Sequence, residues 1–193
     1  MTSLKTIRRL FAITRVEDIS RRYFVVNGFD GALTMLGLLL GFYVGKGVNL
    51  NIVIPACVGA AIALAMSGIT SAYLSEKAER QKDLKSLQDA MVANDLSGSD
   101  HIKATRWVPV WVGLINGLSP LLISLFIISP LWMAQRGVAL PADPVTSAIG
   151  LSFTCIFFLG VFLGRVSGSH WFMSGLQALL IALCTALMIF LIT

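Results

Sequence analysis

Five long apolar runs constrain the fold of this chain more than any other feature. A bilayer core about 30 Å thick is crossed by about 20 apolar residues in a helix, and each run reaches that length. Hydrophobic residues make up 56% of the 193 residues and charged residues only 13%, a composition that excludes an ordinary soluble surface. The sequence therefore predicts one all-α, polytopic membrane domain over residues 1–193. Its five transmembrane helices are expected at about 24–44, 52–74, 107–133, 145–164 and 171–192.

Lysine and arginine are distributed unequally between the two sides of these runs. Six lie before the first run, six lie between the second and third, and Arg165 lies between the fourth and fifth. The other side holds only Lys46 and Arg136, so the ratio is thirteen to two. Basic residues concentrate in cytoplasmic loops. We therefore predict a multi-pass protein of the plasma membrane, with a cytoplasmic N-terminus and an external C-terminus. The net charge of +5 needs no nucleic-acid partner, because no aromatic residues interleave a basic stripe.

The segments that flank the spans also carry patterns. Residues 4–22 place apolar side chains on one helical face among several arginines, which predicts an interfacial amphipathic helix on the inner leaflet. A basic, partly disordered tail is the alternative. Residues 75–106 form the cytosolic loop, and its first part lacks Gly and Pro, so we expect it to continue the second span as a helix. Within the third span, Pro120 is expected to kink or break the helix.

Asp30 lies inside the first span, where a carboxylate costs roughly 2.5–3.5 kcal/mol. Such residues usually face a bundle interior or a water-filled path, and they mark functional sites. Thr34 follows Asp30 by one helical turn, Asn27 precedes it by about one turn, and Met35 is adjacent to Thr34. The alternative is that Asp30 is a protonated packing residue held by hydrogen bonds.

Oxygen and thioether donors in the first three spans predict a site for a metal in transit. Carboxylate and amide oxygens suit hard divalent ions, whereas a methionine thioether suits softer transition metals. Together these donors suit Fe²⁺ or Mn²⁺ as a transported ion, with no cofactor bound permanently. The candidate ligands are Asp30, Asn27, Met35, Met66 and Asn116. For Met35, Met66 and Asn116, a purely structural role is an equal alternative.

A second group of candidate metal ligands lies on the cytosolic helix. Glu76, Glu79 and Asp83 are spaced to share one helical face. Interspersed lysines and arginines make a solvated, charge-laced helix the alternative. The sequence shows no zinc motif, phosphate-binding glycine loop or nucleophile elbow, so we do not expect an enzyme.

Glycines recur every four residues in three of the spans, at 37–45, 113–117 and 160–168. Small residues at this spacing let helix backbones approach closely. The pattern therefore predicts tight helix packing, and the same faces could also form a subunit contact or line a narrow path.

Four segments, taken in order, resemble the vacuolar iron transporter family, and more closely its compact prokaryotic branch. They are RYFVVNGFDGALTMLG at 22–37, AMSGITSAYLSEKAER at 65–80, GLSPLL at 117–122 and FLGVFLGRVSG at 158–168. The resemblance covers about residues 20–193. It implies a five-helix subunit, a homodimer with its path near the first helices, and export of cytosolic Fe²⁺ or Mn²⁺ in exchange for protons.

The resemblance also assigns individual residues. Asp30 matches the family's first-helix aspartate, and Met66 matches a second-helix methionine. The chain departs from the family at Ala72, where the family commonly has a glutamate before the Tyr-Leu-Ser segment. The cytosolic metal-binding domain of larger members is reduced here to about thirty residues.

Two functions follow from these observations. The first is a divalent transition-metal exporter coupled to protons, with the lipid bilayer, a second copy of the chain and metal ions as partners. The alternative is a non-transporting membrane scaffold or partner-binding subunit that acts through its cytosolic helix.

Overall fold

The structure, a computed structural model, describes residues 16–45, 49–90 and 100–192. Within these ranges the chain is helical and contains no strand. Its helices are α2 (Val16–Val44), α3 (Leu50–Ala90), α4 (Asp100–Ile127), α5 (Ser129–Gln135), α6 (Pro144–Val166) and α7 (Trp171–Ile192).

Five of these helices are long and apolar enough to cross a membrane, which indicates an integral, multi-pass membrane protein. The apolar segments are Ser20–Val44, Leu50–Ser86, Trp107–Ile127, Pro144–Val166 and Trp171–Ile192. They agree with the predicted spans to within a few residues at most ends, because long apolar runs dominate the sequence. The second helix extends further, since α3 runs without interruption to Ala90. The helical continuation predicted for the start of 75–106 is therefore confirmed.

Two details of the helices differ from the sequence-based expectations. The third span is not broken at Pro120, because α4 continues through Pro109 and Pro120 to Ile127. A kink at Pro120, the other expected effect, stays a prediction. The break comes at Ile128, and Pro130 lies in the first turn of α5, where its missing N–H removes no helical hydrogen bond. Residues 16–22 belong to α2 rather than to a separate interfacial helix. The remainder of the predicted 4–22 helix lies outside the described residues.

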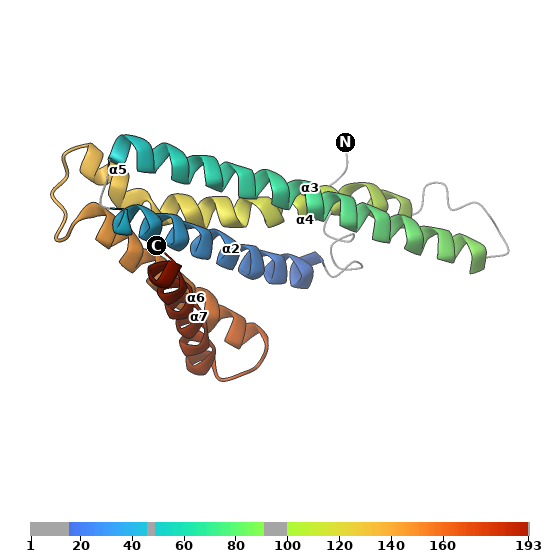
Figure 1. Cartoon of the computed structure of the whole chain (residues 1–193). Coiled ribbons are helices and arrows are strands. Elements are labelled where there is room, and N and C mark those ends of the chain that lie inside the picture. The colour runs from blue at the N-terminus through green and yellow to red at the C-terminus, as the bar shows by residue number, and fades with distance from the viewer. Residues whose placement is uncertain (1–15, 46–48, 91–99, 193) are drawn as a thin grey trace.

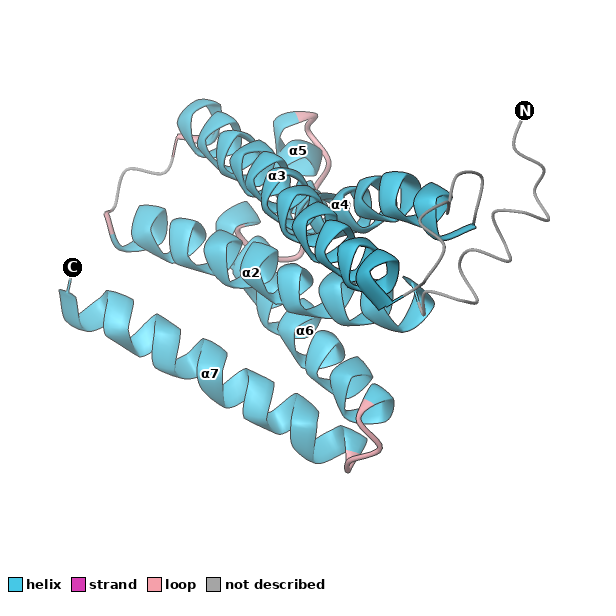
Figure 2. Ribbon diagram, turned by 90° about the vertical axis from the view of Figure 1, so that its right-hand side faces the viewer, coloured by secondary structure: helices cyan, strands magenta, loops and turns pink. Residues whose placement is uncertain are grey.

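Helix α2 occupies the centre of the bundle (Figure 1). Helices α3 and α4 pack against each other, and α4 packs along α2. On the other side of α2, helices α6 and α7 form a hairpin that contacts α2 mainly through α6. Figure 2 shows α7 at the margin of the bundle. Its buried residues are only Gly175, Ala178 and Ala182, so most of α7 faces outward.

Small residues set the closest approaches between helices. A Cβ on Gly31 would lie 2.7 Å from the backbone oxygen of Pro120, so only glycine lets α2 lie against α4 at this level. A Cβ on Gly160 would lie 2.7 Å from the backbone oxygen of Ser174, across the α6–α7 contact. A Cβ on Gly113 of α4 would lie 3.0 Å from the backbone oxygen of Ile69 on α3. Tight packing is therefore confirmed for two of the three glycine stripes.

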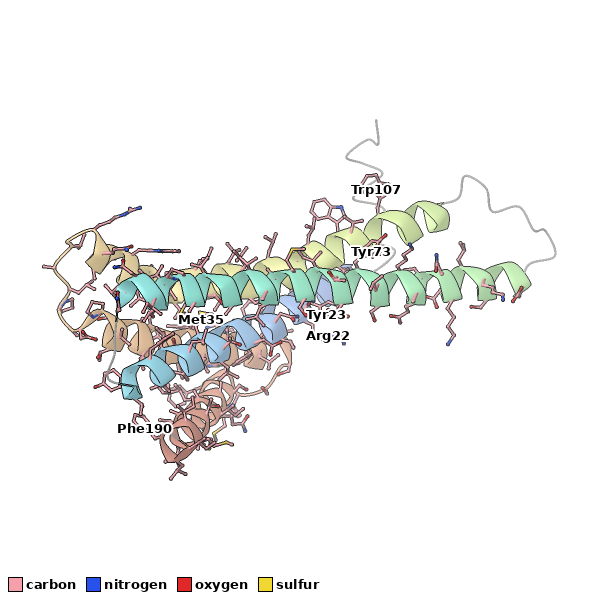
Figure 3. The ribbon with its side chains drawn as sticks, turned by 45° about the horizontal axis from the view of Figure 1, so that its top comes forward. Arg22, Tyr23, Met35, Tyr73, Trp107 and Phe190 are labelled. Carbon is pink, nitrogen blue, oxygen red and sulfur yellow. The ribbon has the colours of Figure 1, made fainter. Side chains whose placement is uncertain are left out.

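Aromatic residues mark both ends of the spans. All four tryptophans and all three tyrosines lie near a span end, as interfacial aromatic belts do. One end of the bundle carries Tyr23, Tyr73, Trp107, Trp111 and Trp171. We name it the basic end, because the segments rich in lysine and arginine adjoin it. Figure 3 shows Tyr23, Tyr73 and Trp107 together at this end, with Met35 further along the bundle. The opposite end carries Tyr43 and Trp132. Twenty residues separate Tyr23 from Tyr43, about 30 Å of helix, which equals the thickness of a bilayer core.

Candidate functional site on helix α2

Asp30 lies on the surface of the bundle, within the membrane-spanning part of α2. Its side chain is exposed. Seven residues of helix place it about 10 Å from the level of Tyr23. A short aspartate side chain cannot reach the interface from that depth as Lys and Arg do. Among the described residues, the carboxylate has no hydrogen bond or ion pair. Asp30 is therefore a charge-bearing group in the apolar region that the described part of the chain leaves uncovered.

The face of α2 around Asp30 is also uncovered. We name Val26, Asp30, Thr34, Gly37 and Gly41, which fall on one side of the helix, the α2 open face. Val26 is 49% exposed. A Cβ added to Gly41 would meet no atom within 4 Å, and one on Gly37 would meet only Ile189 Cδ1 at 3.9 Å. The third glycine stripe therefore has no close partner within the described chain, unlike the stripes on α4 and α6.

Helix α3 presents a similar row of small residues. Gly59, Ala63, Ser67 and Ser71 recur every four residues and are all exposed; we name them the α3 small-residue row. A Cβ on Gly59 would also meet nothing within 4 Å. This row was missed in the sequence, although its signal, one small residue every four, is visible there.

A cluster of hydrogen-bonded polar side chains joins α2, α3 and α4 close to the level of Asp30. The Asn27 amide donates to the Tyr23 backbone oxygen at 2.9 Å and to the Asn116 side-chain oxygen. The Asn116 amide donates to the backbone oxygen of Gly68 at 2.7 Å. Asn116 is only 4% exposed. The cluster accordingly joins α2, α4 and α3, and both asparagines are engaged in helix–helix contacts.

Two serines of α4 extend these contacts along α2. Ser119 donates to the backbone oxygen of Phe24, and Ser124 donates to that of Gly31 at 3.5 Å. Both serines are fully buried. Neither contact can be identified from the sequence, because a serine in a span gives no sign of which neighbouring carbonyl it meets.

The structure separates the two candidate methionines. Met35 is fully buried in the apolar core with Leu36 and Leu39. Five residues along a helix bring it to the side of α2 away from Asp30. Met66 is 57% exposed. It lies in the turn of α3 between Ala65 and Gly68. Because these two residues contact Gly117 and Asn116 of α4, and Asn116 bonds to Asn27 of α2, Met66 lies close to the level of Asp30. Of the two thioethers, only that of Met66 is accessible.

The three acidic candidates on α3 differ in exposure and pairing. Glu76 is only 6% exposed, and its carboxylate forms an ion pair with Arg80 at 2.8 Å, one turn further along α3. Glu79 and Asp83 are exposed. Within the described ranges, no group of three His, Cys, Asp or Glu side chains is arranged to hold a metal ion.

A cavity of about 640 Å³ lies between α2, α6 and α7, beside the residues that flank Asp30. Phe29 and Leu33 line its α2 wall, and Ser169, Ser174 and Gln177 line the wall nearest the α6–α7 turn. The Ser169 hydroxyl lies 3.0 Å from those of Ser167 and Ser174. The cavity is thus polar near the basic end and apolar beside α2, and Asp30 itself is not part of its lining.

The chain is similar to a protein whose function is not known. The chain is 28% identical over 193 residues to an uncharacterized protein of Methanocaldococcus jannaschii, an alignment that covers 98% of this chain and 95% of that protein. No protein-family profile matches the chain. No solved structure matches it either. The resemblance to the vacuolar iron transporter family therefore rests on the four sequence segments alone.

Proposed function

We propose that this protein exports a divalent transition-metal ion, Fe²⁺ or Mn²⁺, from the cytosol, with Asp30 as the central ligand. One observation carries the proposal: Asp30 is exposed on the α2 open face, about 10 Å inside the aromatic belt, and none of the described residues pairs with it. A carboxylate facing hydrocarbon at this depth costs roughly 2.5–3.5 kcal/mol. Such a residue is retained where it faces a watery path, a partner or an ion.

A second copy of the chain would supply that environment. The α2 open face and the α3 small-residue row lack close neighbours, and small residues at this spacing favour close helix association in membranes. A homodimer joined through these faces would bring two Asp30 carboxylates to one path. The site would then be incomplete in a single chain, which supplies one carboxylate and the exposed thioether of Met66.

The donor set supports a divalent transition metal rather than a monovalent ion. Two carboxylates would neutralise one divalent charge, and a thioether adds preference for a softer metal over Mg²⁺ or Ca²⁺. Ala72 is buried, at 5% exposed, and it provides no second carboxylate on α3. Exchange would therefore use Asp30 itself, which can hold either a proton or the ion.

The alternative function, a scaffold or partner-binding subunit, is favoured by one feature. Helix α3 continues 17 residues beyond Tyr73 to Ala90, about 25 Å past the aromatic belt. Its exposed charges include Lys82, Asp83 and Lys85. A charged helix of that length offers a surface for another protein.

Metal flux in proteoliposomes distinguishes the two functions. The purified protein is tested with Fe²⁺, Mn²⁺, Co²⁺ and Zn²⁺ under a proton gradient of either direction, and protein-free vesicles provide the background. We expect flux of Fe²⁺ or Mn²⁺ that changes when the gradient is reversed. An absence of flux for all four metals under both gradients would support the scaffold function instead.

A further inference from the structure

A second cavity, of about 430 Å³, lies between α2, α4 and α6 on the side of α2 opposite Asp30. Its walls carry four phenylalanines: Phe24 of α2, Phe126 of α4, and Phe158 and Phe162 of α6. All four rings are exposed, so the cavity is an open groove on the outer surface of the bundle. Phe24 and Val25, which form its α2 wall, lie six and five residues before Asp30, so they flank the side of α2 that faces away from Asp30.

The groove has about the length of one bilayer leaflet. Along α6 it runs from Leu151 to Phe162, eleven residues or about 16 Å. A leaflet is half of a core about 30 Å thick. Phe162 and Phe24 lie toward the basic end, whereas Leu151 lies about 6 Å beyond the midpoint of α6. The groove therefore extends from the basic end to a little beyond the middle of the bilayer.

The groove offers almost nothing to a polar ligand. Apart from the Cys155 thiol, its one polar side chain is Thr154, and the Thr154 hydroxyl already donates to the backbone oxygen of Gly150 at 2.9 Å. The lining of the groove is therefore suited to an alkyl chain.

Two arginines lie just beyond one end of the groove. Arg21 precedes Phe24 by three residues and Arg165 follows Phe162 by three, so each lies one turn further toward the basic end, on the same side of its helix. Both arginines are exposed. The Arg165 guanidinium lies 5.8 Å from the ring centre of Trp171, which holds it at the level of the aromatic belt. Among the described residues, neither arginine is paired with a carboxylate.

We propose that this groove binds one acyl chain of an anionic phospholipid, whose phosphate lies at Arg21 and Arg165. Lipid tails are as apolar as the side chains of the groove, so burial of a chain gives no hydrophobic driving force within the bilayer. Selection must therefore come from the concave aromatic walls and from the charges. Two cations at headgroup depth, which no carboxylate of the described side chains pairs, favour an anionic headgroup over a zwitterionic one.

Native mass spectrometry of the full-length protein in detergent tests the proposal. Phosphatidylglycerol and phosphatidylcholine with identical acyl chains are the two probes. We expect the wild type to prefer phosphatidylglycerol at least about tenfold, since each basic residue near the headgroups contributes about fivefold. The double variant Arg21→Gln/Arg165→Gln should bind both lipids equally. Thr154→Trp, which fills the groove, should bind neither tightly.

Matched controls come from the same chain. Arg136→Gln removes a cation at the opposite end of the bundle. Thr185→Trp adds the same ring on α7, where the Thr185 hydroxyl donates to its own helix at 2.9 Å, as that of Thr154 does. Both controls should bind phosphatidylglycerol like the wild type.

Three results would overturn the proposal. The first is equal binding of both lipids to the wild type. The second is tight phosphatidylglycerol binding by Thr154→Trp. The third is full displacement of the lipid by glycerol phosphate, which would show an anion site without an acyl groove.

Discussion

At the scale of single residues, exposure separates the candidate ligands of α2 more clearly than residue type does. Asp30 and Met35 are five residues apart, yet Met35 is fully buried and Asp30 is exposed. Asn27 and Asn116 are committed to each other and to the Gly68 carbonyl. Among the candidate ligands within the spans, the side chains that remain accessible for an ion are Asp30 and Met66, and Asp30 gives the sharpest test.

Asp30→Asn should abolish metal flux and leave folding nearly intact. Asn keeps the volume and one oxygen acceptor of Asp, but it lacks the charge that compensates a divalent ion. Flux and thermal unfolding are measured on the same preparations. Asp143→Asn is the matched control: Asp143 caps the start of α6 by accepting from the Val145 and Thr146 amides at 3.1 and 3.3 Å, and Asn also caps helices well. Wild-type flux in the Asp30→Asn variant would refute the role of Asp30.

Asn116→Ala should lower the stability of the protein, and any loss of metal flux should follow from that loss of stability. It removes the bond to the Gly68 oxygen and leaves Asn27 without one acceptor, a loss of about 1–2 kcal/mol for two interhelical hydrogen bonds in a membrane. Reversible unfolding in mixed micelles measures the difference. Asn51→Ala, which removes an exposed bond to Gln135 at 3.1 Å, should change stability far less. A stable Asn116→Ala protein that has lost flux would instead identify Asn116 as an ion ligand.

At the scale of helices, the sequence predicts where spans lie but not which side of each span is buried. In a membrane the protein interior and the lipid are both apolar, so apolar periodicity does not distinguish them. Val25 is 1% exposed and Val26 is 49% exposed, although both are valines in one span. The candidate site could be predicted at Asp30, because a charge is unusual in a span. The open rows of α2 and α3 could not be predicted, because apolar and small residues give no sign of which side of a span is buried.

Pro120 shows the same limit for backbone geometry. A proline inside a helix removes one hydrogen bond and predicts a kink or a break, and α4 is not broken there. The Pro120 backbone lies against Gly31, where no Cβ intervenes. A long-range contact of this kind cannot be predicted from local sequence.

Gly31→Ala should destabilise the bundle by about 1–3 kcal/mol, the usual effect of overpacking a core. The added Cβ would lie 2.7 Å from the Pro120 oxygen and 2.8 Å from its Cα, and backbone atoms cannot move aside as a side-chain tip can. Gly150→Ala on α6, where a Cβ meets nothing within 4 Å, should instead be neutral or stabilising, since Ala is the better helix former. Unfolding of the two variants under identical conditions makes the comparison. Equal stability would mean that α2 and α4 do not approach this closely.

At the scale of the whole molecule, the predicted orientation has a direct test. A cysteine at Ala90 and one at Ile192 lie at opposite ends of the bundle, because α3 ends at the basic end and α7 ends at the other. In oriented vesicles, a membrane-impermeant thiol reagent should label position 192 from outside and position 90 only after permeabilisation. Labelling of both positions from one side would contradict five spans.

The last prediction concerns the dimer that would complete the site. Cys184 is exposed and is first replaced by serine, while Cys57 and Cys155 are buried and can remain. In this background Gly41→Cys should form a disulfide between two copies under mild oxidation, at high lipid dilution, because the α2 open face would meet its own copy across a two-fold axis. Gly150→Cys is the matched control, a helical glycine with equally open space on α6, and it should stay monomeric. Gly41→Leu should then separate the copies and abolish flux while the single chain stays folded, because Leu widens the face without entering the core. Crosslinking at Gly150 but not at Gly41 would place the subunit contact elsewhere and leave Asp30 without a second carboxylate.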